Sequence, residues 1–240
     1  MFSAPCGAPR QAESSIGQVS GVARYDGLAE WYDENLRGFT LRWTDALRQL
    51  LGLGPGRCLD LGCGTGLHFP TLVELGWTTT GVDLSADQLR LAAAHDDAVD
   101  VVQADASALP FEDARFDAVA SIFTHTDIDD YPGAVREGAR VLVPGGRFVH
   151  LGLHPCFVGP FARQVPEDEV PVLFPGYRDT NWTDDAPGFG EGLRRRVGMR
   201  HLPLADLLEA FPDAGLVLGR FEEPGDGVFP HVFAVVGRKP

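Results

Sequence analysis

Three glycines at alternate positions, directly after a short apolar run, constrain this chain more than any other feature of its sequence. A predicted strand ends and a predicted helix begins within Cys58–Gly66, which reads CLDLGCGTG. Glycines at such a junction let the backbone turn sharply, and they let a ligand contact the main chain beside a helix N-terminus. The segment therefore predicts a ligand-binding loop within an α/β fold.

Short apolar runs alternate with amphipathic segments after this loop, which indicates parallel strands joined by crossover helices. The predicted strands are Arg57–Leu61, Thr78–Val82, Asp100–Gln103, Phe116–Phe123, Gly146–Leu153, Leu216–Phe221 and His231–Gly237. The predicted helices are Leu67–Leu75, Ala86–Ala94, Gly133–Leu142 and Leu204–Phe211. A turn signal at Pro144–Gly146 closes the third of these helices.

The chain of 240 residues is long enough for one domain with a single core. Residues 1–21 are rich in Ser, Gly, Ala and Pro without periodicity, which predicts a flexible leader. We expect residues 22–240 to form the domain. Within it, residues 22–54 carry apolar side chains at helical spacing and are predicted to be helical. Residues 154–200, rich in Pro, Gly and aromatic side chains, are predicted to be an insertion that covers the substrate.

Acidic side chains outnumber basic ones, which gives a net charge of 20 − 34 = −14. Nucleic acids and anionic lipids are bound through clustered Lys and Arg, so this balance argues against both as partners. No segment approaches the ~20 apolar residues that span a bilayer, and the N-terminus lacks the apolar core of a secretory signal. We therefore predict a cytoplasmic protein.

The four cysteines are Cys6, Cys58, Cys63 and Cys156, and they show neither a C-x-x-C pair nor the spacing of a zinc finger. In a cytoplasmic protein of this size we expect free thiols rather than a disulfide framework. The sequence predicts no metal site.

Carboxylates stand at the ends of three successive predicted strands. Asp60 precedes the glycine loop, Asp83 ends the second strand and Asp105 ends the third. Each alone could be a solvated residue at a strand end, but three at near-equal intervals point to one binding site. Asp83 is predicted to accept hydrogen bonds from a ribose diol, and Asp105 to accept from an adenine amino group whose ring Leu84 and Ala106 flank.

The loop itself separates two classes of cofactor. A nicotinamide dinucleotide is bound by G-x-G-x-x-G, whereas the spacing here is G-x-G-x-G. The carboxylate of Asp60 would also repel a pyrophosphate, and it would attract a ligand that carries positive charge. The charge argument therefore favours S-adenosylmethionine over NAD.

Later motifs extend the pattern over most of the chain. They are GVDLS at Gly81–Ser85, LPF at Leu109–Phe111, FDAV at Phe116–Val119 and VLVPGGR at Val141–Arg147. With the glycine loop, they make the chain resemble a class I S-adenosylmethionine-dependent methyltransferase of the small-molecule kind (methyltransferase type 11) related to quinone-biosynthesis enzymes. The resemblance runs from about Tyr25 to Gly237 and implies an α/β, Rossmann-like sheet of seven strands. It implies the order 3-2-1-4-5-7-6, with the last strand antiparallel and helices on both faces.

The resemblance also implies which residues hold the cofactor. By this resemblance residues 22–54 would form an N-terminal helical lid, in which Tyr25 and Tyr32 would lie over the methionine part of the cofactor. The full set of predicted cofactor-binding residues is Tyr25, Tyr32, Asp60, Gly62, Cys63, Gly64, Gly66, Asp83, Leu84, Gln88, Asp105, Ala106 and Phe123.

Four polar residues near the carboxyl ends of strands or before the late helix are candidates for catalysis, namely His125, Asp127, His154 and His201. Methyl transfer needs a general base only if the nucleophile is a hydroxyl or a protonated amine. By the family's geometry His125 would lie near the transferred methyl, with Asp127 orienting its ring, and we predict it as the base. The alternative is that the histidines make local hydrogen bonds only. Their long separations argue against a metal site.

The insertion contains aromatic side chains and a basic run. The aromatic residues, which would form either a satellite core or the wall of a pocket for a hydrophobic substrate, are Phe157, Phe161, Phe174, Tyr177, Trp182 and Phe189. The run Arg194–Arg196 is predicted as a solvated face, from which one Arg could bind a substrate carboxylate or phosphate.

The sequence thus predicts a methyltransferase that uses S-adenosylmethionine and acts on a small molecule, as part of secondary metabolism. We expect the acceptor atom to be oxygen or nitrogen rather than carbon, and the protein to be a monomer or homodimer. The first alternative keeps the fold without methylation, as a cyclase or as a silent subunit with a heteromeric partner. The second, a nicotinamide oxidoreductase, conflicts with the spacing of the glycine loop and with Asp60.

Overall fold

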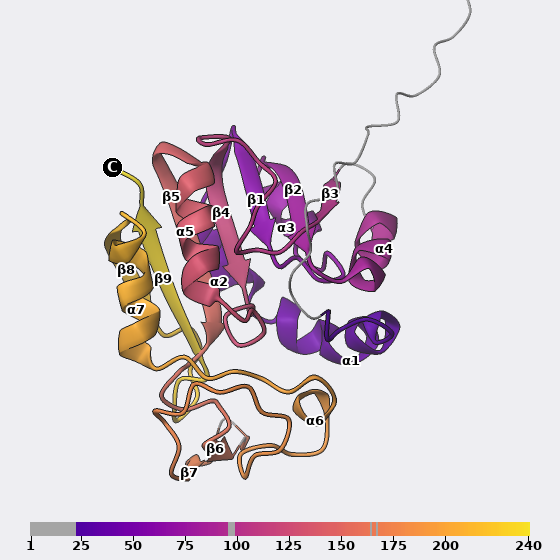
Figure 1. The fold of residues 1–240 in the computed structure, drawn as a ribbon, viewed down its shortest axis with the longest axis vertical. Coiled ribbons are helices and arrows are strands. Elements are labelled where there is room, and N and C mark those ends of the chain that lie inside the picture. Colours follow the sequence, from indigo (N-terminus) through magenta and orange to yellow (C-terminus); the bar gives the residue numbers. More distant parts are fainter. Residues whose placement is uncertain (1–22, 96–98, 164, 167) are drawn as a thin grey trace, which may run out of the picture.

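The computed structural model describes residues 23–95, 99–163, 165–166 and 168–240 of the chain. The predicted leader, residues 1–21, lies outside the described residues. Seven strands form one sheet in the order β3-β2-β1-β4-β5-β9-β8 (Figure 1). The strands are β1 Arg57–Leu61, β2 Thr78–Asp83, β3 Asp100–Gln103, β4 Phe116–Ile122, β5 Leu142–Leu153, β8 Val217–Glu222 and β9 Val232–Arg238.

The pairing of the strands agrees with the order that the resemblance implied. From β3 to β5 all neighbours are parallel, whereas β9 runs antiparallel to both β5 and β8. Counted along the chain within this sheet, the order is 3-2-1-4-5-7-6 with the last strand antiparallel. The predicted fold class is therefore confirmed.

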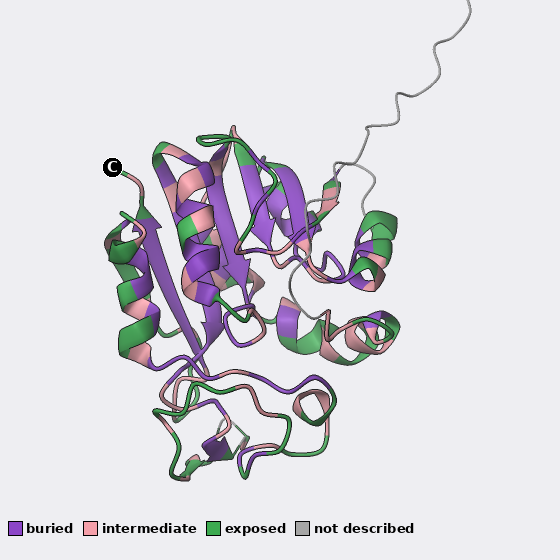
Figure 2. Ribbon diagram, viewed as in Figure 1, coloured by how far each residue is buried: buried purple, intermediate pink, exposed green. Residues whose placement is uncertain are grey.

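Helices cover both faces of the sheet. Successive strand residues point to opposite sides, and the central strands carry apolar side chains on both sides. Leu59 and Val119 pack with α5 and α7, while Cys58 and Ala118 pack with α2 and α3. Figure 2 shows the central strands buried between these layers. The helices are α1 Ala29–Leu41, α2 Thr44–Leu51, α3 Phe69–Glu74, α4 Ala86–His95, α5 Tyr131–Val141, α6 Leu193–Val197 and α7 Leu204–Asp213.

The start of β5 differs from the prediction. The strand begins at Leu142, directly after α5 ends at Val141, so the predicted turn at Pro144–Gly146 lies inside the strand. The register of β5 against β4 shifts here, and Gly145 has a φ of 80°. The N–H of Gly145 donates to the carbonyl oxygen of Lys239 at 2.8 Å. A glycine that tolerates positive φ thus lets a strand continue through an irregularity where the sequence signals a turn.

The lid and the insertion lie at one end of the sheet. Residues 29–51 form α1 and α2, and residues 154–200 contain α6 and the two-stranded sheet of β6 Ala162–Arg163 and β7 Val172–Leu173. Figure 1 shows α1, β6, β7 and α6 beyond the carboxyl ends of the parallel strands. This is the edge at which open α/β sheets bind ligands. In the described part of the chain, no helix has the length and apolar character needed to cross a membrane.

Candidate active site

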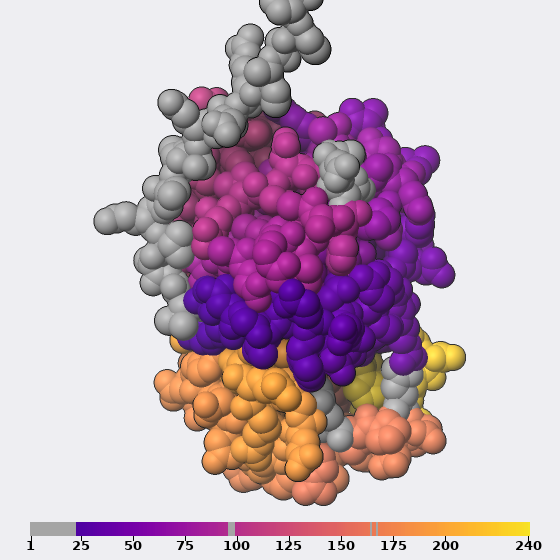
Figure 3. All heavy atoms as spheres, turned by 90° about the vertical axis from the view of Figure 1, so that its right-hand side faces the viewer, coloured from indigo at the N-terminus to yellow at the C-terminus, as the bar shows by residue number. Residues whose placement is uncertain are grey.

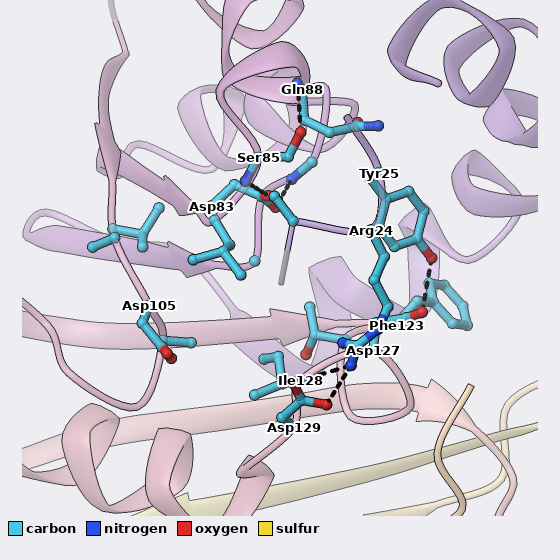
Figure 4. A pocket seen from close by; sticks show the side chains of 18 of the residues that line it. Arg24, Tyr25, Asp83, Ser85, Gln88, Asp105, Phe123, Asp127, Ile128 and Asp129 are labelled. Carbon is cyan, nitrogen blue, oxygen red and sulfur yellow. Dashed lines mark hydrogen bonds and ion pairs between the residues drawn. The ribbon is translucent and has the colours of Figure 1, made fainter. Parts of the chain in front are cut away.

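A pocket opens at the carboxyl ends of β1, β2, β3 and β4, with about 870 Å³ of empty space including its mouth. Figure 4 shows that the side chains around it come from separate loops of the chain. The walls are formed by Gly62 and Gly64, by residues 82–85, 104–106, 122–124 and 127–129, and by the N-terminal residues 23–25 with Tyr32 and Gln88.

The glycine loop forms the floor of the pocket. Gly62 and Gly64 have φ of 76° and 55°, the left-handed region that other residues rarely adopt. The N–H of Gly62 donates to the carbonyl oxygen of Val82 at 2.8 Å, so the loop is held against the end of β2. A Cβ on Gly62 would lie 2.5 Å from Cγ2 of Thr124, whereas a Cβ on Gly64 would meet nothing closer than 3.6 Å. At Gly62 the absence of a side chain is thus required by the backbone conformation and by the space.

Asp83 and Asp105 lie where the sequence predicted them, at the ends of β2 and β3 and in the pocket wall. Asp83 accepts from the N–H of Gly64 and from the N–H of Ser85, both at 2.9 Å. Burial raises the pKa of Asp83 above its usual value, although these backbone hydrogen bonds oppose the shift. Asp105 accepts from the N–H and the hydroxyl of Ser107. Each carboxylate oxygen has more than one lone pair, so both groups can accept further hydrogen bonds from a ligand.

Asp60 lies beneath the pocket rather than in its wall. Its side chain is buried at 2% exposure, and within the described part of the chain its Oδ2 has no hydrogen-bond partner. Burial and, secondly, the charge of Asp83 raise the pKa of Asp60 to about 7. Near neutral pH this carboxyl group therefore carries only part of a negative charge, so Asp83, Asp105, Asp127 and Asp129 supply the carboxylates that face the pocket.

The structure brings ten of the thirteen predicted cofactor residues together around the pocket. Asp60, Cys63 and Gly66 are not among the residues that line it. Gln88 lines the pocket, is buried at 2% exposure, and has neither amide atom paired with another described residue. A buried polar group is normally satisfied, so this amide is suited to hydrogen-bond a bound ligand.

The N-terminal segment forms a roof over the pocket. The hydroxyl of Tyr25 donates to Oδ1 of Asp127 at 2.8 Å, and Arg24 donates to both carboxylate oxygens of Asp129 at 2.9 and 3.1 Å. Figure 4 shows Arg24 and Tyr25 reaching across to the loop that follows β4. Burial and the charge of Asp127 raise the pKa of Tyr25 well above its usual value and that of Tyr32 to about 12, so both phenols stay neutral.

Phe123, at the end of β4, joins the pocket to the lid and the insertion. It has a φ of 57°, which is uncommon for a residue with a side chain, and its N–H donates to the carbonyl oxygen of Leu151 at 2.7 Å. Its ring lies 5.2 Å from the ring of Phe39 in α1. It also packs against the insertion cluster that contains Val158 and Met199. The wall at this side of the pocket is therefore apolar and is shared by three regions of the chain.

The predicted pair of His125 and Asp127 does not form. Asp127 bonds instead to Tyr25, Thr126 and Arg194. His125 is buried at 2% exposure with its ring 5.0 Å from that of His150, and it does not line the pocket. Burial, with weaker contributions from His201 and Arg194, lowers the pKa of His125 to about 3. The interpretation that Asp127 orients His125 is thus wrong, because the chain turns His125 toward the core.

His154 and His201 also lie away from the pocket. His154 bonds through Nε2 to Glu223 at 2.9 Å, and its Nδ1 accepts from the N–H of Cys156. The ring of His201 packs against Phe161 and Tyr177, and burial lowers its pKa to about 4. Both histidines therefore make contacts within the fold, His201 with Phe161 and Tyr177 and His154 with Glu223 and the ring of Phe157.

No metal site is evident among the described residues, where no group of three His, Cys, Asp or Glu side chains could hold an ion. Cys58, Cys63 and Cys156 are free thiols, while Cys6 lies outside the described residues. Of the predicted solvated run, Arg195 and Arg196 are exposed, but Arg194 is mostly buried. It pairs with Asp127 across 67 residues of sequence, a contact that no local signal in the chain indicated.

Comparison with known proteins identifies the central part of the chain. Residues 59–150 match the family model described as a methyltransferase domain. This segment is similar to the methyltransferases of that family. S-adenosylmethionine is the methyl donor of this family.

Individual methyltransferases resemble the chain to different extents. The demethylmenaquinone methyltransferase of Mycobacterium marinum is 39% identical over 133 residues, which are 53% of this chain and 57% of that protein. The chain thus spans little more than half the length of this relative. A methyltransferase structure from Mesorhizobium loti has a TM-score of 0.67 and 23% identity, covering 81% of this chain and 96% of that one. The [4+2]-cyclase SpnF has a TM-score of 0.60 and 21% identity, with 83% and 81% covered. Both structures show the shared fold.

The pocket of the methyltransferase domain fits the family's cofactor in its donor set. Gln88 presents an unpaired amide, and Asp83 and Asp105 present acceptors at adjacent strand ends. Gly62 and Gly64 line the pocket, so the main chain of the loop can contact a ligand. These features suit a nucleoside with hydroxyl and amino donors. Asp127 and Asp129 are paired with Arg194 and Arg24, so it is the carboxylates of Asp83 and Asp105 that suit a ligand with positive charge.

Proposed function

We propose that the protein transfers a methyl group from S-adenosylmethionine to a small-molecule acceptor. The observation that supports this most directly is the convergence of the glycine loop, Asp83 and Asp105 on one pocket in a methyltransferase domain. When bound, the cofactor supplies an electrophilic methyl group on a sulfonium. The protein's own contribution is then to bind, to align and to exclude water.

Each side chain has a distinct part in binding. Asp83 would accept hydrogen bonds from ribose hydroxyls, and Asp105 would accept from the adenine amino group, between Leu84 and Ala106. Gln88 would hydrogen-bond through its unpaired amide. Tyr25 would cover the pocket, where its neutral phenol and that of Tyr32 place little charge near a sulfonium.

The acceptor would approach from the side of Phe123 and the insertion. Phe123 contacts both the lid and the insertion cluster, so an acceptor there would meet an apolar wall next to the cofactor pocket. The pocket is not lined by His125, His154 or His201. A catalytic role for any of them would require the protein to rearrange when an acceptor binds. Because demethylmenaquinone methyltransferases are among the relatives, quinols should be tested as acceptors together with phenols and amines.

Calorimetry separates this function from the nicotinamide alternative. The full chain is titrated with S-adenosylmethionine, with its product S-adenosylhomocysteine, and with NAD and NADP. We expect heat from the first two and none from the nicotinamide cofactors. Uptake of NAD without any heat from either adenosyl compound would contradict the proposal.

A second assay separates methylation from the chemistry of a cyclase, which has the same fold. The protein is incubated with radiolabelled S-adenosylmethionine and a panel of phenols, primary amines and 1,4-naphthoquinol. Label in an acceptor supports methyl transfer, and its position identifies oxygen, nitrogen or carbon. A protein that binds S-adenosylmethionine but labels no member of the panel supports the non-methylating alternative.

A further inference from the structure

One arginine of the insertion is directed into the protein rather than into solvent. The side chain of Arg194 is 13% exposed, whereas that of Arg195 is 43% exposed. The guanidinium of Arg194 donates to both carboxylate oxygens of Asp127, at 2.5 and 3.3 Å. It also donates to the carbonyl oxygen of Gly198 and to the hydroxyl of Thr126, both at 3.2 Å. Four hydrogen bonds thus fix this side chain between α6 and the loop after β4.

Asp127 connects this arginine to the roof of the pocket. Asp127 and Tyr25 both line the pocket, and Arg194 does not. The Oδ1 atom of Asp127 that accepts from Arg194 is also the atom that accepts from the hydroxyl of Tyr25, at 2.8 Å. Tyr25 in turn packs edge to face against Tyr32, with 5.6 Å between the ring centroids. The position of both rings therefore depends on where the carboxylate of Asp127 is held.

Arg194 is also the counter-charge of Asp127. The side chain of Asp127 is 14% exposed, and a buried ion pair is strongly disturbed when one of its partners is removed. Burial disfavours the charged guanidinium, but Asp127 and Tyr25 outweigh this effect and the pKa of Arg194 lies above its usual value. Without the guanidinium, the carboxylate of Asp127 would lose two of its hydrogen bonds and could turn toward water, and the hydroxyl of Tyr25 would lose its acceptor.

The insertion is attached to the roof by a second contact that does not involve Asp127. The guanidinium of Arg24 lies 3.6 Å from the ring centroid of Trp182 in the insertion and pairs with Asp129. Figure 3 shows the surface of α1 lying directly against that of the insertion. The loss of Arg194 therefore leaves the insertion attached while it releases Asp127, so the effect on the roof can be separated from loss of the insertion.

We propose that Arg194 is a positioning residue of the cofactor pocket, which from the insertion holds Asp127 in the place where it fixes Tyr25 over the cofactor. This inference rests on the proposed function, because it assumes that the pocket binds an adenosyl cofactor. It assigns to the insertion a part in cofactor binding, in addition to its predicted part in covering the substrate.

The test measures binding of S-adenosylhomocysteine, which needs no acceptor. Calorimetry compares the wild type with Arg194→Ala, Tyr25→Phe and the double variant. The matched control is Arg195→Ala, which removes the neighbouring exposed arginine. We expect Arg194→Ala to weaken binding about tenfold or more, because a hydrogen-bonded buried pair is broken, and Arg195→Ala to leave it unchanged. The double variant should bind no more weakly than the worse single variant, since both residues act through Asp127.

Two further measurements distinguish positioning from a structural role. Guanidinium at millimolar concentration should restore part of the affinity of Arg194→Ala, and Arg194→Lys should keep part of it, as a charge without the planar fork. If Arg194→Ala lowers the thermal midpoint but binds as tightly as the wild type, the inference is wrong and the proposed function stands. If the wild type binds no S-adenosylhomocysteine, the proposed function fails and the inference with it. Should Arg194→Ala not fold, affinity in Arg194→Lys equal to that of the wild type would overturn the inference, because that variant lacks the planar fork that holds Asp127.

Discussion

Asp83 accepts the backbone N–H of Gly64 at 2.9 Å, so one carboxylate at the end of β2 holds the glycine loop that follows β1. The same side chain accepts from the N–H of Ser85 with its other oxygen. The carboxylate of Asp83 therefore both fixes the conformation of the glycine loop and provides a hydrogen-bond acceptor for a ligand. This relationship makes Asp83 the residue whose replacement tests the site most directly.

We expect Asp83→Asn to weaken S-adenosylhomocysteine binding about tenfold or more. An amide can accept only through its oxygen, so either Gly64 or Ser85 would face an NH₂ group and lose its acceptor. Calorimetry measures the effect, with Asp100→Asn as a control because Asp100 is exposed at the start of β3. Equal affinity in Asp83→Asn and the wild type would show that the loop does not depend on this carboxylate.

Two glycines of the loop should respond differently to alanine. Gly62 and Gly64 both have positive φ, and a left-handed conformation costs a residue with a side chain about 1–2 kcal/mol. Only at Gly62 would the new methyl also lie 2.5 Å from Thr124, against 3.6 Å to the nearest atom at Gly64. Urea unfolding should therefore show a larger loss of stability for Gly62→Ala. The reverse order would mean that Thr124 moves aside without cost.

The pH dependence of stability should reveal Asp60. Burial and Asp83 raise its pKa to about 7 in the folded protein, whereas the ordinary value of 3.8 applies to the unfolded chain. Protonated Asp60 therefore contributes stability that is fully present below pH 3.8. This contribution, about 4 kcal/mol, is lost as the pH rises from 3.8 through about 7.

The variant Asp60→Asn does not ionise, so the difference between it and the wild type isolates this effect. We expect the variant to gain in free energy of unfolding, relative to the wild type, as the pH rises from 4 to 8. Urea unfolding at pH 4, 5, 6, 7 and 8 measures the difference. A difference that stays constant across this range would show that Asp60 titrates at its ordinary pKa.

Most of the fold could be predicted because its signals are local. The strands Arg57–Leu61 and Asp100–Gln103 have the predicted bounds, since turn residues bracket a short apolar run in each case. Where a local signal and the tertiary structure disagree, the prediction fails. The sequence at Pro144–Gly146 indicates a turn, but pairing with β4 and β9 carries β5 through it.

The cofactor side of the site could be predicted for a similar reason. Carboxyl ends of adjacent parallel strands meet at one edge, so chain position alone placed Asp83 and Asp105 together. The catalytic side could not. Phe123 takes a left-handed conformation, which a phenylalanine in the sequence does not indicate, and the chain after it directs Thr124 to the pocket and His125 into the core. The burial of Arg194 depends on a partner 67 residues away.

A chain of buried hydroxyl groups leads from the pocket into the core. Thr124, which lines the pocket, lies 2.5 Å from the hydroxyl of Ser121, and Ser121 lies 3.0 Å from the hydroxyl of Tyr131. Tyr131 in turn lies 2.7 Å from Nδ1 of His150. Burial, with a smaller effect from His125, lowers the pKa of His150 well below its usual value, so this imidazole is neutral. Tyr131 is thus a buried member of this network, at 2% exposure, with His150 fully buried beyond it.

We expect Tyr131→Phe to lower the free energy of unfolding by about 1–3 kcal/mol, because it leaves Nδ1 of His150 without its partner in the core. Tyr177→Phe is the matched control, since its hydroxyl accepts from the N–H of Leu204 but the side chain is only half-buried. Water can replace that hydroxyl, so the control should lose less. Urea unfolding of both variants at pH 7 gives the comparison. Equal losses would mean that water reaches the site of Tyr131, and the buried network would then not stabilise the sheet beneath the pocket.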